Sequence, residues 1–323
     1  MNNRIVPFGL VAAAVAAIAL IGIILLTRSD SGAQTGAQLT PSPAQSDPGT
    51  LVITYISEPD GNYDVYLVRS DGTGLKRLTA GPGNEEHAYW SPDGTRIVYQ
   101  ASAGLSLGIW IMNADGSGKL RLGEGMGPSW SPDGKQILYT RDGHGLSVMN
   151  ADGSGRTSVV PLPFSPSFAT WAANGKIVFV RGGWQRRDGG DLYAVNPDGS
   201  GLEQLTKGAR MTWPSVSPDG STIAAYAQDA DRLIAVPYRA YGPAVTLLAR
   251  ASRHFPNGGV PLAHWAPDGM QLVLGSSNSN EDYGAGLFLV NADGSGLRRI
   301  PDVAQAIGPD WRPSATPSSS PGE

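Results

Sequence analysis

The sequence predicts an all-β protein: a six-bladed β-propeller of four-stranded antiparallel blades, preceded by one N-terminal transmembrane helix. The main observation is a repeated segment, Trp-Ser-Pro-Asp-Gly, which occupies residues 90–94 and 130–134. Variants of this segment begin at 171, 216, 265 and 311, so that neighbouring copies start 40 to 49 residues apart. A period of about 40–50 residues made of short strands is typical of propeller blades.

A second observation concerns the residues between two copies of this segment. Short runs of β-branched and aromatic residues, such as Ile97–Tyr99 and Ile109–Met112, are separated by Gly-rich turns such as Asn113–Gly118. Apolar runs punctuated by Asp-Gly turns predict antiparallel hairpins. No stretch after residue 30 has a helical period, so we expect four strands in each blade.

The two ends of the repeat region are complementary. The first repeat begins at Leu51 without a Trp-containing strand before it, whereas the last repeat ends on such a strand, at about Ile307–Trp311. We therefore expect this last strand to complete the first blade beside Val52–Thr79. A ring closed in this way removes the exposed edges that an open array would present.

Composition divides the chain into five parts. Residues 1–4 are expected in the cytoplasm, and residues 5–27, which contain no charged side chain, are long enough to form a transmembrane signal anchor. Residues 28–50 form a Ser-, Gly- and Pro-rich linker that we expect to be disordered. The propeller covers 51–312, and 313–323 form a disordered tail.

The N-terminal segment also permits a second interpretation. Ser31-Gly32-Ala33 could serve as the cleavage site of a secretory signal, although the apolar run is longer than the 7–15 residues typical of such signals. Both interpretations place the propeller outside the cytoplasm. We expect a single-pass protein of the cell membrane with the propeller on the periplasmic or extracellular side.

Composition also excludes several functions. The formal net charge is -4, with 24 basic and 28 acidic residues, which argues against nucleic acid as the main partner. The chain has no Cys, so disulfides, thiol catalysis and Cys-based metal sites are excluded.

The repeat resembles the PD40 (WD40-like) repeat of the TolB-type propeller family over residues 51–312. The resemblance is strongest in Trp90–Gly94, Trp130–Gly134, Trp265–Gly269 and the Asn-Ala-Asp-Gly-Ser-Gly turns. The resemblance implies that the Trp-containing strand is innermost and that Pro-Asp-Gly turns it into the next strand. The family's namesake carries an α/β domain before its propeller. A predicted membrane span stands there instead, so the namesake's partner cannot be assigned to this chain.

Two local motifs suggest chemistry that their context does not support. Gly104–Gly108 matches G-x-S-x-G, but it lies between two strands, whereas a nucleophile elbow needs a following helix. The Asn113–Gly118 turn resembles half of a calcium loop. Position 12, where a calcium loop needs Glu, is Glu124 in this copy, but it is Pro161 in the copy that begins at Asn150 and Asp302 in the copy that begins at Asn291. We interpret these segments as hairpin turns, and we interpret Trp110, Trp130, Trp171 and Trp265 as core between blades.

The predicted inner strands carry the chain's most reactive side chains. Glu86, His87 and His264 lie on these strands, and Asp310 has the same register in its blade as His264 has in the preceding one. Imidazole and carboxylate groups could form a metal or acid–base site, or they could simply line a wet channel. Nothing in their spacing requires a metal, and we predict neither a metal nor another cofactor.

Binding residues are also expected on loops. Trp184, Arg186 and Arg187 combine an aromatic ring with cations between two strands, and Arg210 and Trp213 lie at the start of an inner strand. Trp, Tyr and Arg often dominate protein interfaces. Loop variation without a function is the alternative explanation.

Together these features predict a membrane-tethered, extracytoplasmic propeller that binds a protein or peptide partner in the cell envelope and is not an enzyme. Two alternatives remain open. One is an envelope hydrolase or lyase that acts on polysaccharide at the channel mouth, and the other is a structural scaffold. Fold alone does not separate them.

Overall fold

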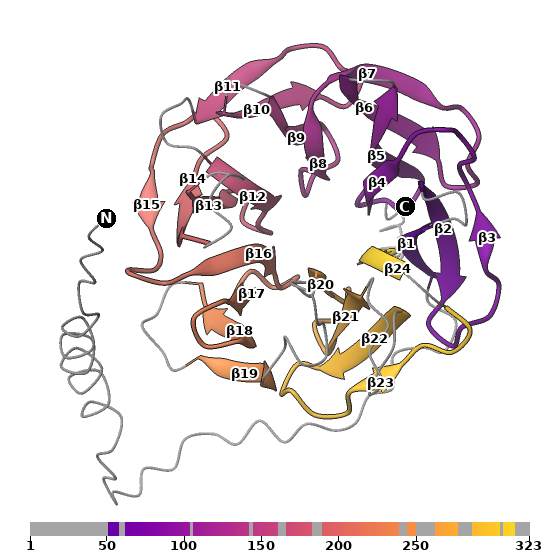
Figure 1. Cartoon of the computed structure of the whole chain (residues 1–323). Helices are drawn as coiled ribbons and strands as arrows, with labels where there is room; N and C mark the ends of the chain where they lie inside the picture. The colour runs from indigo at the N-terminus through magenta and orange to yellow at the C-terminus, as the bar shows by residue number, and fades with distance from the viewer. Residues whose placement is uncertain are drawn as a thin grey trace, which may run out of the picture. The chain divides into compact units, whose positions relative to one another are not determined.

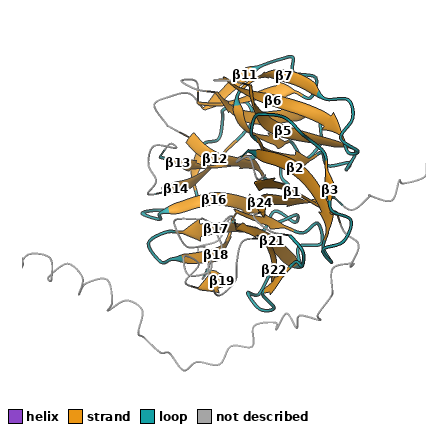
Figure 2. Ribbon diagram, turned by 45° about the vertical axis from the view of Figure 1, so that its right-hand side comes forward, coloured by secondary structure: helices purple, strands orange, loops and turns teal. Residues whose placement is uncertain are grey.

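The computed structural model describes ten segments of the chain: residues 51–57, 62–103, 106–141, 145–160, 166–182, 189–238, 244–249, 262–276, 286–303 and 306–313. Within these segments the secondary structure consists of 24 strands arranged in six four-stranded sheets (Figure 1). The view in Figure 2 shows strands joined by loops. No helix in this part of the chain is long and apolar enough to cross a membrane. The predicted span (5–27) and linker (28–50) lie outside the described residues.

The strands of each sheet follow one another from the innermost to the outermost. The first sheet contains β24 (Ala306–Trp311), β1 (Leu51–Ser57), β2 (Tyr63–Arg69) and β3 (Lys76–Arg77). The second contains β4 (Glu85–Trp90), β5 (Arg96–Ala103), β6 (Ser106–Asn113) and β7 (Leu120–Glu124). The third contains β8 (Met126–Trp130), β9 (Gln136–Arg141), β10 (Gly145–Asn150) and β11 (Thr157–Val160).

The fourth sheet contains β12 (Pro166–Trp171), β13 (Ile177–Arg181), β14 (Asp191–Val195) and β15 (Glu203–Gln204). The fifth contains β16 (Met211–Val216), β17 (Thr222–Ala227), β18 (Arg232–Pro237) and β19 (Val245–Ala249). The sixth contains β20 (Leu262–Trp265), β21 (Gln271–Ser276), β22 (Gly286–Asn291) and β23 (Arg298–Arg299). All pairs within the sheets are antiparallel, which confirms the predicted architecture of the blades.

The ring closes as the two ends of the repeat region predict. Strand β24 pairs with β1, with Val52 opposite Trp311 and Ile56 opposite Ala306. The first blade therefore combines the first three strands of the ring with the last one, and the two ends meet within one sheet (Figure 1). This arrangement pairs the strands that an open array would leave as free edges.

The hydrophobic core lies between neighbouring sheets. In one cluster, Val65 and Leu67 of β2 pack with Trp90 of β4 and Ile97 of β5. Of the repeated indoles, Trp90, Trp130, Trp171 and Trp311 are all less than 9% exposed. Trp265 is half-buried and donates its indole N–H to the Ser215 carbonyl of the preceding blade at 3.1 Å. The interpretation of these rings as packing between blades is thus confirmed for the Trp-Ser-Pro-Asp-Gly repeat.

The Asn-x-Asp-Gly-Ser-Gly segments are hairpin turns whose polar groups satisfy one another. Asp115 Oδ1 accepts hydrogen bonds from the Ser117 amide at 2.9 Å and the Ser117 hydroxyl at 2.6 Å, and the Asn113 side chain donates to Ser117 Oγ at 2.9 Å. The same contacts recur at 150–155, 196–201 and 291–296. These turns account for the motif as local structure.

Each such turn also contacts the preceding blade closely. A Cβ atom built on Gly199, which has φ +84°, would lie 2.8 Å from the carbonyl oxygen of Val159 in the third sheet. Real Cβ atoms essentially never approach an oxygen this closely. Glycine is therefore required at this position both by the turn conformation and by the contact between blades.

Candidate functional site

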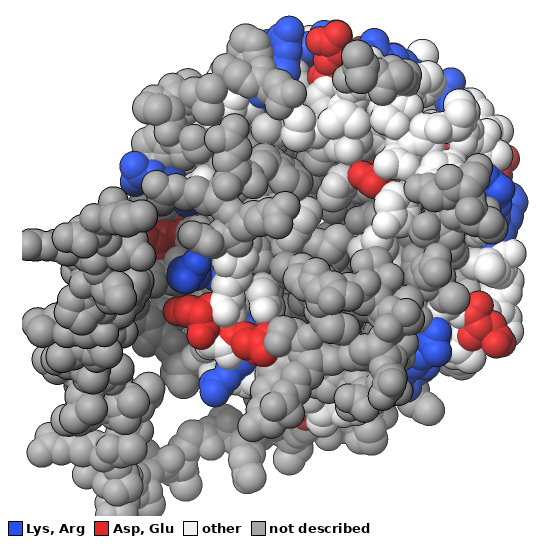
Figure 3. All heavy atoms as spheres, in the orientation of Figure 1, with Lys and Arg blue, Asp and Glu red and all other residues white. Residues whose placement is uncertain are grey.

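A cavity of about 320 Å³ lies at the centre of the ring. Residues from all six inner strands line it: β4, β8, β12, β16, β20 and β24. On the face shown in Figure 3, the visible Lys and Arg side chains lie away from the centre of the ring. Because the lining comes from six blades, side chains far apart in the sequence can act together as one site.

Five of the inner strands share an irregularity at the cavity. Their pairing with the next strand shifts register within a few residues of the repeat's anchor position. The residue three positions before that anchor has a positive φ angle in each: His87, Gly127, Phe168, Trp213 and Gly308. Strand β20 pairs without a shift. Each irregularity is a β-bulge, which redirects side chains relative to the regular pleat.

Three of these bulges place a bulky residue in an unfavourable backbone conformation. His87, Phe168 and Trp213 have φ angles of 50°, 50° and 53°. A left-handed conformation costs an L-residue with a Cβ atom roughly 1–2 kcal/mol, and for bulky residues it is a genuine outlier. Gly127 and Gly308 adopt it without this cost. Backbone strain of this kind clusters at binding and active sites, which marks these three side chains as candidate binding groups.

The three strained side chains lie near one another in the cavity lining. The ring centroids of Phe168 and Trp213 are 4.2 Å apart with an interplanar angle of 50°. The rings of His87 and Trp213 are stacked at 5.8 Å and 18°. All three line the cavity and are only partly buried. Together, His87, Phe168 and Trp213 form an aromatic wall that spans β4, β12 and β16.

Polar side chains line the cavity at the position immediately before the anchor residue, which is two residues after the bulge position. His264 Nδ1 faces Asp310 Oδ1 at 3.7 Å, and the second Asp310 oxygen accepts the Trp90 amide at 2.9 Å. The Tyr89 ring lies 5.2 Å from the His264 ring. The common register predicted for His264 and Asp310 therefore does bring them together, and Tyr89 holds the same position, immediately before an anchor residue, in the next blade.

Burial determines the charge of this cavity. It raises the pKa of Asp310 to about 7, although backbone amides of Trp90 and Trp311 favour the carboxylate. Burial lowers the pKa of His87 to about 4, and burial together with His87 lowers that of His264 to about 4. The pKa of Tyr89 is raised, first by burial and then by Asp310. Between pH 4 and 7 the lining is therefore essentially uncharged, and above pH 7 it carries one negative charge.

The structure brings together only part of the predicted site. His87, Trp213, His264 and Asp310 line the cavity. Glu86 pairs with Gln100 in the sheet and is not in the lining, and burial raises its pKa.

Arg210 is exposed just before β16 and does not line the cavity. Trp184, Arg186 and Arg187 lie outside the described residues. Phe168 is absent from the predicted site, although it stands three residues before Trp171 just as His87 stands before Trp90.

The suggested grouping of His87, His264, Asp310 and Glu86 around a metal has no counterpart in the described residues. These contain no group of three or more His, Asp or Glu side chains that could hold a metal ion. The geometry that is present is one imidazole facing one carboxyl group, beside an aromatic wall.

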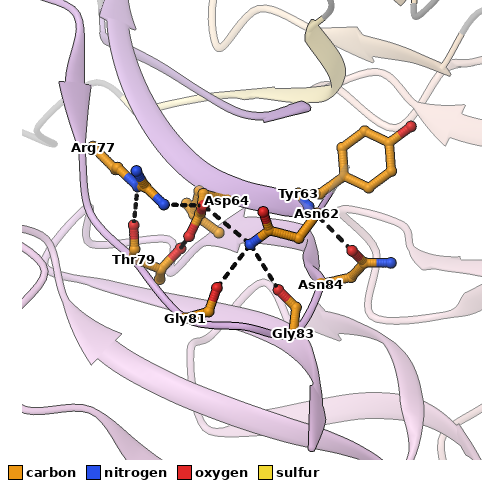
Figure 4. A network of polar contacts seen from close by, with 9 residues as sticks. Asn62, Tyr63, Asp64, Arg77, Thr79, Gly81, Gly83 and Asn84 are labelled. Atoms are coloured by element: carbon orange, nitrogen blue, oxygen red, sulfur yellow. Dashed lines mark hydrogen bonds and ion pairs between the residues drawn. The ribbon is translucent and has the colours of Figure 1, made fainter. Parts of the chain in front are cut away.

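A second polar cluster lies between the first two blades (Figure 4). The fully buried Asp64 pairs with Arg77 and accepts the Thr79 hydroxyl at 3.1 Å. Thr79 in turn accepts the Val65 amide at 2.8 Å. Glu85 is buried nearby, and its burial and the adjacent Asp64 raise its pKa to about 7.

This second cluster is a feature of the repeat. Asp191 and Thr206 form the same contact in the fourth blade, where the hydroxyl donates to the carboxylate at 3.1 Å. In the second blade, Gly108 and Gly123 occupy the two corresponding positions counted from the Asp-Gly turn. Because the Asp and the Thr occur or are replaced together, we assign the cluster a structural role.

Six four-stranded sheets that close around a central cavity define a β-propeller. The comparisons confirm the resemblance to the TolB-type propeller family that the repeats show. The family described as the TolB beta propeller domain (PD40) matches residues 23–180. The remaining sheets extend the same architecture to Trp311.

Curated relatives match parts of the chain. The Tol-Pal system protein TolB of Geobacter sulfurreducens is 34% identical over 77 residues, which is 23% of this chain and 18% of that protein. Dipeptidyl-peptidase 5 of Porphyromonas gingivalis is 34% identical over 161 residues, which is 44% of this chain and 22% of that protein. The chain thus spans about a fifth of the length of these relatives.

Solved structures match the fold over most of the chain. TolB from Acinetobacter baumannii superposes with a TM-score of 0.69 at 17% identity, covering 83% of this chain and 68% of that one. A chain of the nidogen/laminin complex superposes with a TM-score of 0.62 at 12% identity, covering 82% and 98%. At these identities the likeness concerns the fold alone.

Proposed function

We propose that this protein is a membrane-tethered, extracytoplasmic propeller that binds a protein or peptide partner of the cell envelope at its central cavity. The observation that carries the proposal is the aromatic wall of His87, Phe168 and Trp213. Three bulky side chains keep an unfavourable backbone conformation and lie near one another in a cavity. Strain of this kind persists where a rigid arrangement is needed for recognition.

The size and lining of the cavity suit a side chain or a short peptide segment. A volume of about 320 Å³ is at the lower end of the range for ligand pockets, which combine apolar walls with a few polar groups. Rigid aromatic side chains are the residues that most often dominate binding energy. That a Geobacter relative is named as a Tol-Pal system protein supports a role within a protein system.

Loop residues predicted from the sequence would extend this contact. Trp184, Arg186 and Arg187 are proposed as additional binding residues because they combine an aromatic ring with two cations. Arg210 is exposed immediately before the strand that carries Trp213. Glu86, which the structure places outside the lining, is not part of the proposed contact.

The membrane tether is proposed from residues 5–27, which contain no charged side chain. Fractionation of bacterial cells that express the chain tests it. The full chain should stay with the membranes at high salt and be released by detergent. A soluble form that begins near Gln34 would show instead that the segment is a cleaved signal.

Binding at the cavity can be tested with a library of displayed random peptides and the full chain held in detergent. The wild-type chain should enrich peptides that the Trp213→Ala variant does not retain. Leu120→Ala is the matched control, because Leu120 is 56% exposed on the outermost strand of its blade. If Trp213→Ala retains the same peptides as wild type, the cavity is not the binding site.

An enzyme remains the second candidate, because the His264–Asp310 pair offers an acid and a base in one cavity. A carboxyl group with a pKa of about 7 suits general acid–base catalysis near neutral pH. Hydrolysis or cleavage of an envelope polysaccharide that His264→Ala abolishes would favour this candidate over the binding module.

A further inference from the structure

The cavity has a chemical preference that narrows the choice of partner. Resting on the proposed function, we propose that the cavity receives the positively charged end of a basic side chain, lysine or arginine, presented by the protein partner. Asp310 would pair with the charge, and the aromatic wall would surround the side chain's stem and charged group. Three features of the lining carry this proposal.

The first feature is the balance of charge in the lining. Its titratable groups are His87, Tyr89, His264 and Asp310, and no Lys or Arg contributes to it in the described residues. Both imidazoles and the phenol are neutral near pH 7. Asp310 is therefore the one group in this lining that can carry charge under these conditions.

The second feature is the geometry around the Asp310 carboxyl group. Its Oδ2 accepts the Trp90 amide at 2.9 Å, whereas its Oδ1 lies 3.7 Å from His264 Nδ1, beyond the range of a hydrogen bond. A carboxylate offers about four acceptor positions. Its side chain is 18% exposed, so an ammonium or guanidinium group in the cavity can reach it.

The third feature is the aromatic wall itself. The faces of aromatic rings attract cations, most strongly for Trp, and the attraction grows when water is excluded. Trp213 contacts both Phe168 and His87, and the Tyr89 ring lies beside His264 on another part of the lining. These rings and the Asp310 carboxyl group all line the same small cavity, so a cation bound there would lie among aromatic side chains and a carboxylate.

Other ligand types fit this lining less well. An acidic side chain would meet the Asp310 charge without any Lys or Arg among the described lining residues to offset it. An apolar side chain would bury the ionised carboxylate without a partner, which is costly. A basic side chain supplies that partner and buries its alkyl stem against the rings.

The proposal also fixes the direction of a pH effect. His264 from β20 faces Asp310, Tyr89 from β4 feels its charge, and His87 from β4 is the remaining titratable group of the lining. None of these three changes its charge between pH 5.5 and 8.5. Asp310, with a pKa of about 7, does ionise in this interval, while a lysine ammonium stays charged. Binding of a cation should therefore strengthen as the pH rises through 7.

The test uses the full chain in detergent, labelled with 5-fluorotryptophan and observed by fluorine NMR. The Trp213 resonance is assigned from its loss in Trp213→Phe. The probes are the Nα-acetyl methylamides of lysine and arginine, with those of norleucine and citrulline as neutral controls of similar shape. The basic probes should shift the Trp213 resonance, the neutral ones should not, and comparison of lysine with arginine shows which group is preferred.

Asp310→Asn is the decisive variant, since asparagine can still accept the Trp90 amide. We expect it to weaken binding of the basic probes roughly tenfold or more, because it removes the charge-assisted contact. Asp229→Asn, at an exposed carboxylate outside the cavity, should leave binding unchanged. Should Asp310→Asn fail to fold, the rise in wild-type affinity between pH 5.5 and 8.5 provides an independent test.

Three outcomes would overturn the inference: equal shifts by neutral and basic probes, affinity that does not depend on pH, or no shift by any basic probe at about 20 mM, a concentration that would reveal even millimolar binding. Failure of this inference differs from failure of the proposed function. If displayed peptides without Lys or Arg bind in a manner that needs Trp213, the binding module stands and the cation preference falls.

Discussion

The rings of Phe168 and Trp213 lie 4.2 Å apart on neighbouring inner strands, although both residues have φ angles near +50°. Each ring therefore reaches the cavity from a β-bulge that would suit glycine better. The first and third blades do use glycine there, at Gly308 and Gly127. Bulky residues at the equivalent positions place a ring in the cavity, and the backbone is less stable there than it would be with glycine.

The strained backbone predicts that, at position 213, a glycine variant is more stable than an alanine variant, the reverse of the order in an ordinary strand. Trp213→Gly and Trp213→Ala remove the same ring, but only alanine keeps the Cβ atom that is strained at φ +53°. We expect the free energy of unfolding of the glycine variant to exceed that of the alanine variant by about 1 kcal/mol. Denaturant unfolding of both variants measures the difference.

The control for this comparison is His264, which lies on the regular inner strand β20. There His264→Gly should be less stable than His264→Ala, as in ordinary strands. The same sign at both positions would mean that the bulge is not strained.

Ring closure predicts a strong effect of removing Ile307–Glu323. The truncation deletes most of β24, which pairs with β1, and removes Trp311, which is 3% exposed in the core. Loss of one large buried aromatic side chain costs about 3–5 kcal/mol, so the thermal midpoint should fall by roughly 10 °C or more. Differential scanning calorimetry checks this, and removal of 314–323 alone is the control that leaves β24 intact.

The contact between blades predicts that two glycines in the fourth blade respond differently to alanine. Gly175 and Gly199 have similar φ angles, +79° and +84°. A Cβ atom on Gly175 would meet nothing within 4 Å, whereas one on Gly199 would lie 2.8 Å from the Val159 carbonyl oxygen. Gly175→Ala should cost roughly 1 kcal/mol from backbone strain, and Gly199→Ala roughly an additional 1–3 kcal/mol from the clash. Similar losses in urea unfolding would contradict the close contact.

Glu85 predicts a pH-dependent difference in stability. Its pKa is raised from an ordinary 4.5 to about 7 in the folded state, first by burial and then by Asp64. The stability associated with the protonated group is therefore complete below pH 4.5 and is lost as the pH rises through 7. Glu85→Gln avoids this loss and should raise the unfolding free energy relative to wild type at pH 8, on the order of 2 kcal/mol, but not at pH 4.5.

Wild type and Glu85→Gln must be compared at each pH, because the titration of other buried groups changes the stability of both proteins in the opposite direction. The pKa values of His87 and His264 are lowered to about 4. Their contribution to stability rises with pH between 4 and 6.5 and offsets that of the raised carboxyl groups. A Glu85→Gln effect that is equal at pH 4.5 and pH 8 would mean that Glu85 is not perturbed.

The architecture of the ring was predictable because its signal repeats. The Trp-Ser-Pro-Asp-Gly segment fixes the inner strand and the turn that follows it, and its spacing identifies each blade. The absence of a Trp strand before Leu51 and the surplus one at Trp311 indicated how the ring closes. The neighbouring positions of His264 and Asp310 followed from their common register before an anchor residue.

The aromatic wall could not be predicted because its backbone conformation has no local signature. Positive φ angles are expected for Gly or Asn, not for Phe or Trp, so nothing in the local sequence singles out Phe168. The glycines at 127 and 308, in the same register, were the available signal. Glu86 was assigned to the site together with His87, but it pairs with Gln100 just before the bulge and does not line the cavity.

Asp310 belongs to the last strand of the ring in chain order, and that strand is also the one that joins the two ends. The aromatic wall, Tyr89 and His264 come from strands that are synthesised earlier. A ribosome that stops before residue 306 would therefore release a chain whose cavity lacks its carboxylate as well as its closing strand. Binding of a basic side chain through Asp310, as proposed above, would then be confined to chains whose ring is complete.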